Sequence, residues 1–391
     1  MAAAPVSLAE LAGVFFRIGW LAFGGPVAQL GLIHDECVER RGWLDDEQFV
    51  RALNFVHVLP GPEATQMALI VGWRVRGVLG GTLAGLLFVI PGFLTLTGLA
   101  WVYVHFGSRP EVLGVLSGFR PVGLALLLAA MVRLGRAALR TRFQLMLSLA
   151  AFVASAVFQI GFVPLLLGAG CISLVRGRLS ARTSSAAVAL AVLLPLRAQA
   201  LSAAAERLKD ISWFFLQVGL VSFGGAYAVL PLLREGAVVH FGWVTDRQMV
   251  DALALGETTP GPLISIGMFL GYLAGHPLGA GWAGAACAGF WLFIPSFLFV
   301  LAGAPHLDRI TALPGVKPFL EGITAAVVAL MASVSLVLIR ATVFPEGRVD
   351  WLTAGLGVAA FLLLVFARQR VSVVAVVLAG GVLGLVRGLL L

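Results

Sequence analysis

The sequence predicts an all-α polytopic membrane protein built from two homologous helical repeats. Three observations support this fold class: few charged residues, long apolar runs and an internal repeat. Only 12% of the 391 residues are charged and 60% are hydrophobic, whereas soluble domains carry about 25% charged residues. A chain of this composition cannot cover a water-exposed surface with polar groups, so much of its surface is expected to face lipid.

The apolar runs predict helices rather than strands. Residues 78–103 and 121–132 are long apolar segments, and about 20 such residues cross a bilayer as a helix. In lipid the backbone must satisfy its own hydrogen bonds, which only helices and closed barrels achieve. Barrel strands would alternate apolar and polar residues, and these runs do not alternate.

The internal repeat appears when the chain is compared with itself. A shift of 200 places residues 15–62 on 215–262 without a gap, and from Ile90 onward the shift becomes 204. The matched motifs are Phe23-Gly24-Gly25 with Phe223-Gly224-Gly225, Gly42-Trp43 with Gly242-Trp243, and Pro60-Gly61-Pro62 with Pro260-Gly261-Pro262. We therefore predict a first repeat at 1–199, a polar linker at 200–210 and a second repeat at 211–391.

Thirteen membrane spans are predicted, seven in the first repeat and six in the second. They lie at 9–30, 46–76, 79–105, 111–134, 143–159, 160–176, 183–199, 211–234, 247–275, 279–302, 316–340, 350–367 and 371–390. An odd first half would turn the second half upside down, and a modest excess of Lys and Arg at the predicted cytoplasmic ends agrees with this. If 46–76 instead enters the membrane and returns as a hairpin, the count changes by one and the inversion is lost.

Other classes of protein find little support. The N-terminus lacks the features of a removable signal peptide, and the scattered Cys37, Cys171 and Cys287 suggest neither a disulfide framework nor a metal site. The run His34 to Cys37 is not expected to bind metal, because adjacent helical residues point in different directions. No motif of a hydrolase, a metalloprotease or a P-loop is present. We expect no enzyme activity, no cofactor, no metal and no nucleic-acid partner.

The two Pro-Gly-Pro motifs are the strongest candidates for a site. Glycine can take backbone angles closed to other residues, and the second proline suits the first position of a new helix. Each motif is therefore predicted to stop and restart a helix inside the membrane, where the restarted N-terminus can bind an anion. The alternative is a pair of proline kinks that only shape the bundle, although two breaks at matched positions favour a site.

Further residues are expected to contribute to binding. The Gly-Gly pairs can form unwound segments that face the Pro-Gly-Pro tips, or they can serve close helix packing. Arg17 could offset the charge of a bound dianion, and Thr65 and Ser265 could line the same cavity. The predicted anion-binding set is Gly24, Gly25, Pro60, Gly61, Pro62, Gly224, Gly225, Pro260, Gly261, Pro262, Arg17, Thr65 and Ser265.

Three ionisable residues next to the Pro-Gly-Pro motifs are candidates for proton coupling. His57 and Glu63 flank the first motif, and Glu257, the repeat counterpart of His57, precedes the second. Ionisable groups inside a membrane are costly and often mark a transport pathway, although each could instead be a structural hydrogen-bonding group. Arg120, at the start of a predicted span, could offset a dianion's charge as Arg17 could, although the favoured expectation is that it extends its charge toward the interface.

These motifs resemble the chromate ion transporter family in its long, two-repeat form. The resemblance rests on Phe-Gly-Gly-Pro, Gly-Trp and Pro-Gly-Pro in the same order in the first half, with all but the Phe-Gly-Gly proline repeated in the second, where Ala226 stands at the position of Pro26. It implies a protein of the bacterial inner membrane that exports chromate, confers chromate resistance and uses the proton gradient. It also implies thirteen spans with the halves in opposite orientation.

The expected function is thus secondary active transport of a tetrahedral oxyanion, with chromate or sulfate, protons and the lipid bilayer as partners. A homodimer is one alternative for its assembly. The alternatives in function are transport of sulfate or another oxyanion, a passive anion channel, and, from another class, a membrane-embedded enzyme or a lipid flippase.

Overall fold

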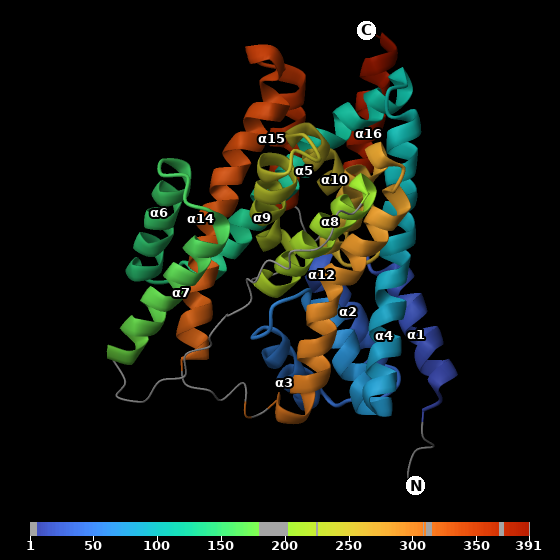
Figure 1. Ribbon diagram of the computed structural model, residues 1–391, viewed down its shortest axis with the longest axis vertical. Coiled ribbons are helices and arrows are strands. Elements are labelled where there is room, and N and C mark those ends of the chain that lie inside the picture. The colour runs from blue at the N-terminus through green and yellow to red at the C-terminus, as the bar shows by residue number, and fades with distance from the viewer. Residues whose placement is uncertain are drawn as a thin grey trace.

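The structure is a computed structural model that describes residues 6–179, 202–223, 226–307, 309, 315–366 and 371–390. Within these ranges all regular secondary structure is helical (Figure 1), which confirms the predicted all-α class. Five stretches are long and apolar enough to cross a membrane by length and composition. They are Glu63–Phe106, Pro110–Ala138, Gly281–His306, Val316–Val343 and Val373–Leu390. The chain is an integral membrane protein.

The helices follow one another in the same order in the two repeats. The first repeat contains α1 (Leu8–Leu21), α2 (Gly25–His34), the π-helix η1 (Asp35–Glu39), α3 (Asp46–Val56), α4 (Glu63–Phe106), α5 (Pro110–Ala138), α6 (Arg142–Ala156) and α7 (Phe162–Leu179). The second contains α8 (Ala203–Val221), η2 (Ala226–Val229), α9 (Leu230–Arg234), the π-helix η3 (Glu235–His240), α10 (Asp246–Thr258), η4 (Leu263–Ser265), α11 (Ile266–Gly275), η5 (His276–Leu278), α12 (Gly281–Gly303), η6 (Ala304–His306), α14 (Val316–Val343), η7 (Pro345–Gly347), α15 (Trp351–Phe366) and α16 (Val373–Leu390).

Local details of the two repeats match closely. A π-helix follows α2 and another follows α9, and a capping box with Gln48 or Gln248 starts the next helix. A side-chain contact across the π-helix then joins the end of α2 to the start of α3, and the end of α9 to the start of α10. His34 Nε2 lies 2.8 Å from Asp46 Oδ1, and Arg234 Nε lies 2.6 Å from Asp246 Oδ1. The internal repeat seen in the sequence is therefore also a repeat in structure.

Helix α4 is a hairpin of two arms. Arg76 and Gly77 leave helical geometry, with φ +63° at Gly77, and the chain reverses there. Gly72 then packs against Gly80, and Gly85 lies against Leu69, so the arms 63–75 and 78–106 run antiparallel. In the second repeat, α11 and α12 form the same hairpin around Gly279, where φ is +70°.

The long second arm of α4 sets the depth of the helix breaks. It has enough residues to extend about 40 Å at 1.5 Å per residue, and Pro91 lies at its middle. Helix α1 crosses it closely, because an added Cβ at Gly19 would lie 2.8 Å from the Leu87 carbonyl oxygen and 3.0 Å from Pro91. In the second repeat, Gly219 of α8 packs in the same way on the middle of α12, against Leu292 and Pro295. Both α1 and α8 end within a turn of these contacts, so the breaks lie near the middle of the long arm of α4 and of α12.

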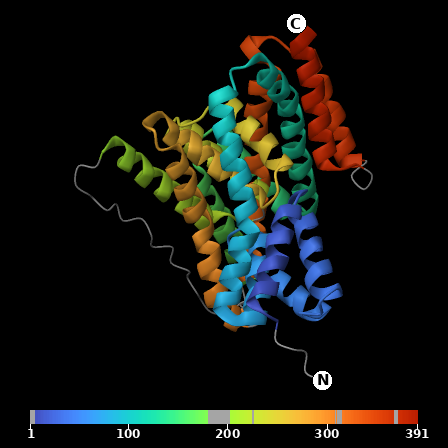
Figure 2. The same ribbon diagram turned by 90° about the vertical axis from the view of Figure 1, so that its right-hand side faces the viewer.

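The opening helices of the two repeats lie toward different ends of the molecule. Figure 1 places α1, α2 and α3 toward one end and α8, α9 and α10 farther toward the other. Figure 2 shows α1 and α16 at opposite ends from a second direction. The long helices α4 and α12 lie between them and bring the middle parts of the repeats into contact.

Several predicted boundaries change. The predicted span 9–30 is not one helix, because α1 ends at Leu21 and α2 begins at Gly25. The predicted interruption of 46–76 is present between Val56 and Glu63. Residues 203–210 of the predicted linker form the first turns of α8. The predicted span 183–199 lies outside the described residues.

Glu36 stabilises the end of the first repeat that holds α1 and α2. Its carboxylate is 3% exposed; it lies 2.5 Å from the guanidinium of Arg17 and 2.7 Å from that of Arg40, and it also accepts a hydrogen bond from Arg41. Burial alone would raise the pKa of Glu36. The hydrogen bond from Arg41 and the charges of the three arginines outweigh burial and lower the pKa below its ordinary value.

Replacing Glu36 is expected to destabilise the protein. Glu36→Gln leaves the three arginines without their carboxylate, so the free energy of unfolding should fall by about 2 kcal/mol, as measured by thermal unfolding in detergent. The matched control is Glu39→Gln, since the Glu39 side chain is 64% exposed. Because the folded pKa of Glu36 is lowered, the difference from wild type should be full at neutral pH and shrink as pH falls below the ordinary value of 4.5. Equal unfolding temperatures for the two variants would contradict this role.

Candidate functional site

The two Pro-Gly-Pro breaks cross over and bond to the opposite repeat. The Gly61 N–H donates to the Ser222 carbonyl at 2.8 Å, and the Gly261 N–H donates to the Ala22 carbonyl at 3.1 Å. Ala22 and Ser222 are repeat counterparts that end α1 and α8. The four helix breaks are therefore joined in two pairs, each by one of two equivalent hydrogen bonds.

Only glycine fits at the centre of each crossing. Gly61 has φ +132°, and a Cβ there would overlap the Ser296 hydroxyl of α12. Gly261 has φ +98°, and a Cβ there would lie 3.0 Å from the Gly92 Cα of α4. Gly92 and Ser296 are themselves counterparts under the shift of 204, so each tip contacts the same position of the other repeat's long helix.

Helices restart directly after the breaks, as the sequence predicts. Pro62 precedes α4 and Pro262 precedes η4, each with an extended backbone. The N–H groups of a first helical turn have no acceptor inside the helix, which makes such a terminus a site for negative charge. The amides of Gly61 and Gly261 are not part of this supply, because the crossing already uses them.

Buried polar atoms without a partner surround the same tips. Among the described residues, the hydroxyls of Thr65, Ser265 and Ser296 and the side-chain oxygen of Gln66 make no hydrogen bond. All four side chains are fully buried, while the Gln66 amide nitrogen donates to the Pro60 carbonyl at 2.7 Å. Buried polar atoms are almost always paired in proteins, so these atoms point to a ligand or water at the crossing.

The Gly-Gly segment of the first repeat separates α1 from α2. Gly24 and Gly25 have φ of +84° and +79°, and α2 starts there with Pro26 in its first turn. Gln29 of α2 reaches from here to the crossing, since its amide donates to the Gly261 carbonyl at 2.8 Å and to the Ala22 carbonyl at 3.1 Å. Gly224 and Gly225 lie outside the described residues.

The three candidate coupling residues have unlike surroundings. Glu257 is 4% exposed and accepts a hydrogen bond from the Tyr227 hydroxyl, with the Arg133 charge nearby. His57 is about half exposed, and its Nε2 lies 3.7 Å from Glu63 Oε2. The second repeat thus holds a buried carboxylate where the first has a water-accessible imidazole.

Arg17 lies apart from the tips in this structure. It belongs to the Glu36 cluster, where its guanidinium is paired and its side chain is 51% exposed.

The residues that sequence reasoning did not assign to the site are Arg133, Gln29 and Ser296. Arg133 was hard to recognise because its repeat counterpart is Val337 and only the fold brings α5 to Tyr227 and Glu257.

Two cavities enter the molecule at matching positions. The first, called the His57 cavity, has a volume of about 550 Å³, and its lining includes His57, Arg140 and Lys317. The second, called the Arg120 cavity, has a volume of about 310 Å³ and is lined partly by Arg120, Arg247 and Arg387. Under the shift of 204, Leu113, Ser117, Arg120, Ala341 and Thr342 of the second match Lys317, Glu321, Thr324, Ala137 and Ala138 of the first. Only the His57 cavity has a lining residue, His57, next to a Pro-Gly-Pro motif.

Arg120 does not simply extend to an interface. Its guanidinium forms two hydrogen bonds with Asp251, at 2.7 and 3.0 Å, and Asp251 is fully buried. The Tyr103 hydroxyl donates to the same carboxylate at 2.9 Å. The expectation for Arg120 was wrong because a single acidic residue on α10, far away in the sequence, binds it.

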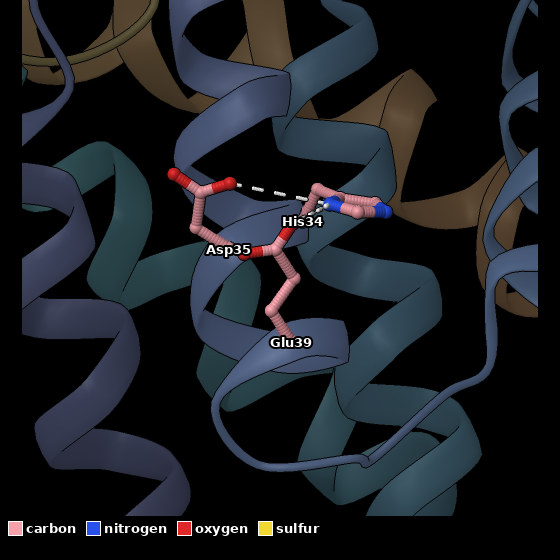
Figure 3. A group of neighbouring side chains, drawn as sticks. All are labelled: His34, Asp35 and Glu39. Atoms are coloured by element: carbon pink, nitrogen blue, oxygen red, sulfur yellow. Dashed lines mark ion pairs between the residues drawn. The ribbon is translucent and has the colours of Figure 1, made fainter.

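His34, Asp35 and Glu39 form a small group at the surface of the first repeat (Figure 3). His34 Nδ1 lies 3.8 Å from Glu39 and 4.0 Å from Asp35, and its Nε2 is taken by Asp46. Cys37 is buried and Glu36 is bound by arginines, so the run His34 to Cys37 does not converge on one point. Within the group, His34 connects α2 to the start of α3 through Asp46.

Comparison with known proteins gives the family. The model of the family described as "Chromate transporter" matches residues 9–174 and again 209–385. The chain belongs to the chromate transporter family. Both halves of the chain match the family model, in agreement with the internal repeat. No solved structure matches the chain.

Relatives of this family cover nearly the whole chain. The chromate transport protein of Pseudomonas aeruginosa is 35% identical over 394 residues, which is 97% of this chain and 92% of that protein. The chromate transport protein of Cupriavidus metallidurans is 31% identical over 399 residues, 97% and 93% of the two chains. The probable chromate transport protein of Synechococcus elongatus is 32% identical over 340 residues, 85% of each.

Adding one methyl group at the crossing should abolish the site. Gly61→Ala places a Cβ in the Ser296 hydroxyl at a backbone angle unfavourable for alanine, so anion transport should fall by about tenfold or more. The control is Gly98→Ala in the same helix, because an added Cβ meets nothing within 4 Å there. Transport is measured in liposomes after equal amounts of folded protein have been verified. Normal transport by Gly61→Ala would exclude the crossing as the site.

Proposed function

We propose that this protein transports chromate across the membrane. The observation that supports the proposal most directly is the pair of bonded breaks at Gly61 and Gly261, each followed by a helix start and flanked by unpartnered polar side-chain atoms. The curated relatives described above are named as chromate transport proteins. Sulfate has the same charge and shape as chromate, so we expect it to compete.

In the proposed site the anion replaces water at the crossing. Its oxygens accept hydrogen bonds from hydroxyls such as Thr65, Ser265 and Ser296 and from first-turn amides of α4 and η4. A dianion in a low-dielectric site also needs positive charge nearby. Arg133 is the described arginine next to Glu257 and Tyr227, and Arg17 remains a candidate if the Glu36 cluster opens.

We also propose that the two repeats are inverted in the membrane. The regions 9–30 and 46–76 each break at mid-depth and return toward the end from which they came, as do their counterparts in the second repeat. A single returning hairpin would change the parity of the first repeat, but two leave it odd. The count of thirteen spans is then replaced by fewer full crossings and four returning pairs, and the repeat boundaries at 1–199 and 211–391 are kept.

Proton coupling is proposed for Glu257, with His57 and Glu63 on the water-accessible side. A buried carboxylate is costly when charged, and here only Tyr227 and Arg133 offset that cost. Binding of an anion near Arg133 would remove part of this compensation and favour uptake of a proton by Glu257. We further propose that the N-terminus lies in the cytoplasm of a bacterial inner membrane, that the His57 cavity opens to that side, and that an inward proton gradient drives efflux.

Flux measurements test the proposal. Purified protein in liposomes should move chromate faster than empty liposomes, and external sulfate or molybdate should reduce the rate to different extents. An imposed proton gradient should drive accumulation, and a protonophore should abolish it. No chromate flux would reject the function, and a flux indifferent to the protonophore would leave a passive channel.

Glu257→Gln separates coupling from binding. The amide keeps the shape of the side chain and can still bond to Tyr227, but it cannot exchange a proton. Accumulation driven by the proton gradient should fall by about tenfold or more, while exchange of labelled chromate against chromate should continue. Glu111→Gln, on the exposed first turn of α5, is the control and should behave as wild type. If Glu257→Gln still accumulates chromate in a protonophore-sensitive way, another group carries the proton.

A further inference from the structure

The Arg120 cavity gathers more positive charge than any other described cavity. Arg120, Arg247 and Arg387 line it together with Asp350. Arg387 is paired with Asp350 at 2.7 Å, and Arg120 with the buried Asp251. Arg247 forms none of the ion pairs found among the described residues, although its charge acts on Asp251. The three guanidinium groups exceed the two carboxylates by one positive charge.

Hydroxyl groups complete the lining. Ser117, Thr342 and Thr353 belong to the same cavity, and Thr353 also bonds to Asp350. Guanidinium groups bind the oxygens of a tetrahedral anion in pairs and remain charged at any working pH. A volume of about 310 Å³ admits an anion of this size with several waters.

The positive charges of Arg120 and Arg247 have no counterpart in the matching cavity, whose own basic lining residues, Arg140 and Lys317, stand at other positions. Thr324 stands at the position of Arg120, Glu47 at that of Arg247 and Met146 at that of Asp350. Asp251 corresponds to Arg51, which is half exposed and paired with Glu47. The arginines are therefore not a by-product of the duplicated fold but a property of one end of the molecule.

Asp251 separates the Arg120 cavity from the helix breaks. It lies on α10 two turns before Thr259 and binds α5 through Arg120 and α4 through Tyr103. An anion that passes between the crossing and this cavity must move near these three side chains. Arg120 can hold either Asp251 or an incoming anion with the same pair of N–H groups.

We propose that the Arg120 cavity is a second binding site for a tetrahedral oxyanion, at which Arg120 exchanges Asp251 for the anion. This inference rests on the proposed function, because it places the site at the end of the pathway opposite to the His57 cavity. Arg247 and Arg387 hold the anion there, and the exchange at Arg120 loosens α10 from α5.

Protection of a single introduced cysteine tests the site. Ser117→Cys lies in the cavity lining, and its reaction with a bulky maleimide is followed in purified protein by peptide mass spectrometry, so the native cysteines can remain. Sulfate should slow the reaction. When Arg247→Gln is combined with Ser117→Cys, the sulfate concentration that halves the labelling rate should rise about tenfold. This is the effect expected from the loss of one charged hydrogen-bonding group.

The matched control is Arg348→Gln, which removes the same charge from an exposed position between α14 and α15 and outside the cavity lining. Its half-protecting sulfate concentration should stay within about twofold of wild type because exposed charges interact weakly with distant sites. Equal shifts for Arg247→Gln and Arg348→Gln would mean general screening and would overturn the site.

Asp251→Asn and Tyr103→Phe test the exchange at Arg120. Asp251→Asn removes the carboxylate that competes with the anion for Arg120, so the half-protecting sulfate concentration should fall. Tyr103→Phe takes one hydrogen bond from Asp251 and leaves Arg120 as its main partner, so the half-protecting concentration should rise. No change in either variant, or a shift in the same direction in both, would overturn the exchange.

The inference and the proposed function fail in different ways. If wild-type protein moves chromate but sulfate never protects position 117, the second site is wrong and the transport function stands. If sulfate protects with the predicted pattern but no chromate flux is found, the site stands and the proposed function falls.

Discussion

The structure depends on the reciprocal hydrogen bonds between the tip of one repeat and the broken helix of the other. A helix that stops inside a membrane leaves backbone groups that lipid cannot satisfy. Here the Gly61 and Gly261 amides and the carbonyls of Ala22 and Ser222 satisfy one another across the repeats. Neither repeat could close this arrangement alone, so the break motifs and the duplication are one structural requirement. The close approach also explains why there is no room for a side chain at Gly61 and little room for one at Gly92.

Much of this fold could be predicted from the sequence because its determinants are local. Pro-Gly-Pro stops a helix wherever it stands, and the gapless shift of 200 shows that the chain is duplicated. The turn at Gly77 also agrees with the sequence, because it falls between the predicted spans 46–76 and 79–105. The break at Gly24 was harder to predict, because glycines are common in membrane helices and the pair Gly24-Gly25 fits close helix packing as well as an unwound segment.

The sequence pointed to the glycines and prolines of the candidate site and to Thr65, Ser265 and Glu257, but not to the charged partners that the fold supplies. Arg120 and Asp251 are 131 positions apart, and no pattern links them until α5 and α10 are packed together. The same is true of Arg133 with Tyr227. Arg17 shows the opposite case, since its position near the glycines suggested an anion site, yet Glu36 on the next element binds it. Charges inside the membrane take whichever partner the fold supplies, and a single sequence does not reveal that choice.

The two repeats keep the same backbone but divide the charged chemistry. His57 faces water where Glu257 is buried, and Thr324 and Arg51 stand where Arg120 and Asp251 form a buried ion pair. An exact duplication would give both ends of the pathway the same affinity for an anion and for protons. Removing a charge from one partner of a buried pair costs several kcal/mol, about 3–5 in proteins, so the Arg120–Asp251 pair strongly favours the closed state at its own end. At the matching position of the other repeat, Arg51 is half exposed and pairs with the exposed Glu47, an interaction of little strength. The difference biases the structure toward being open at the His57 cavity, and an anion that compensates Arg120 is the natural agent to reverse that bias.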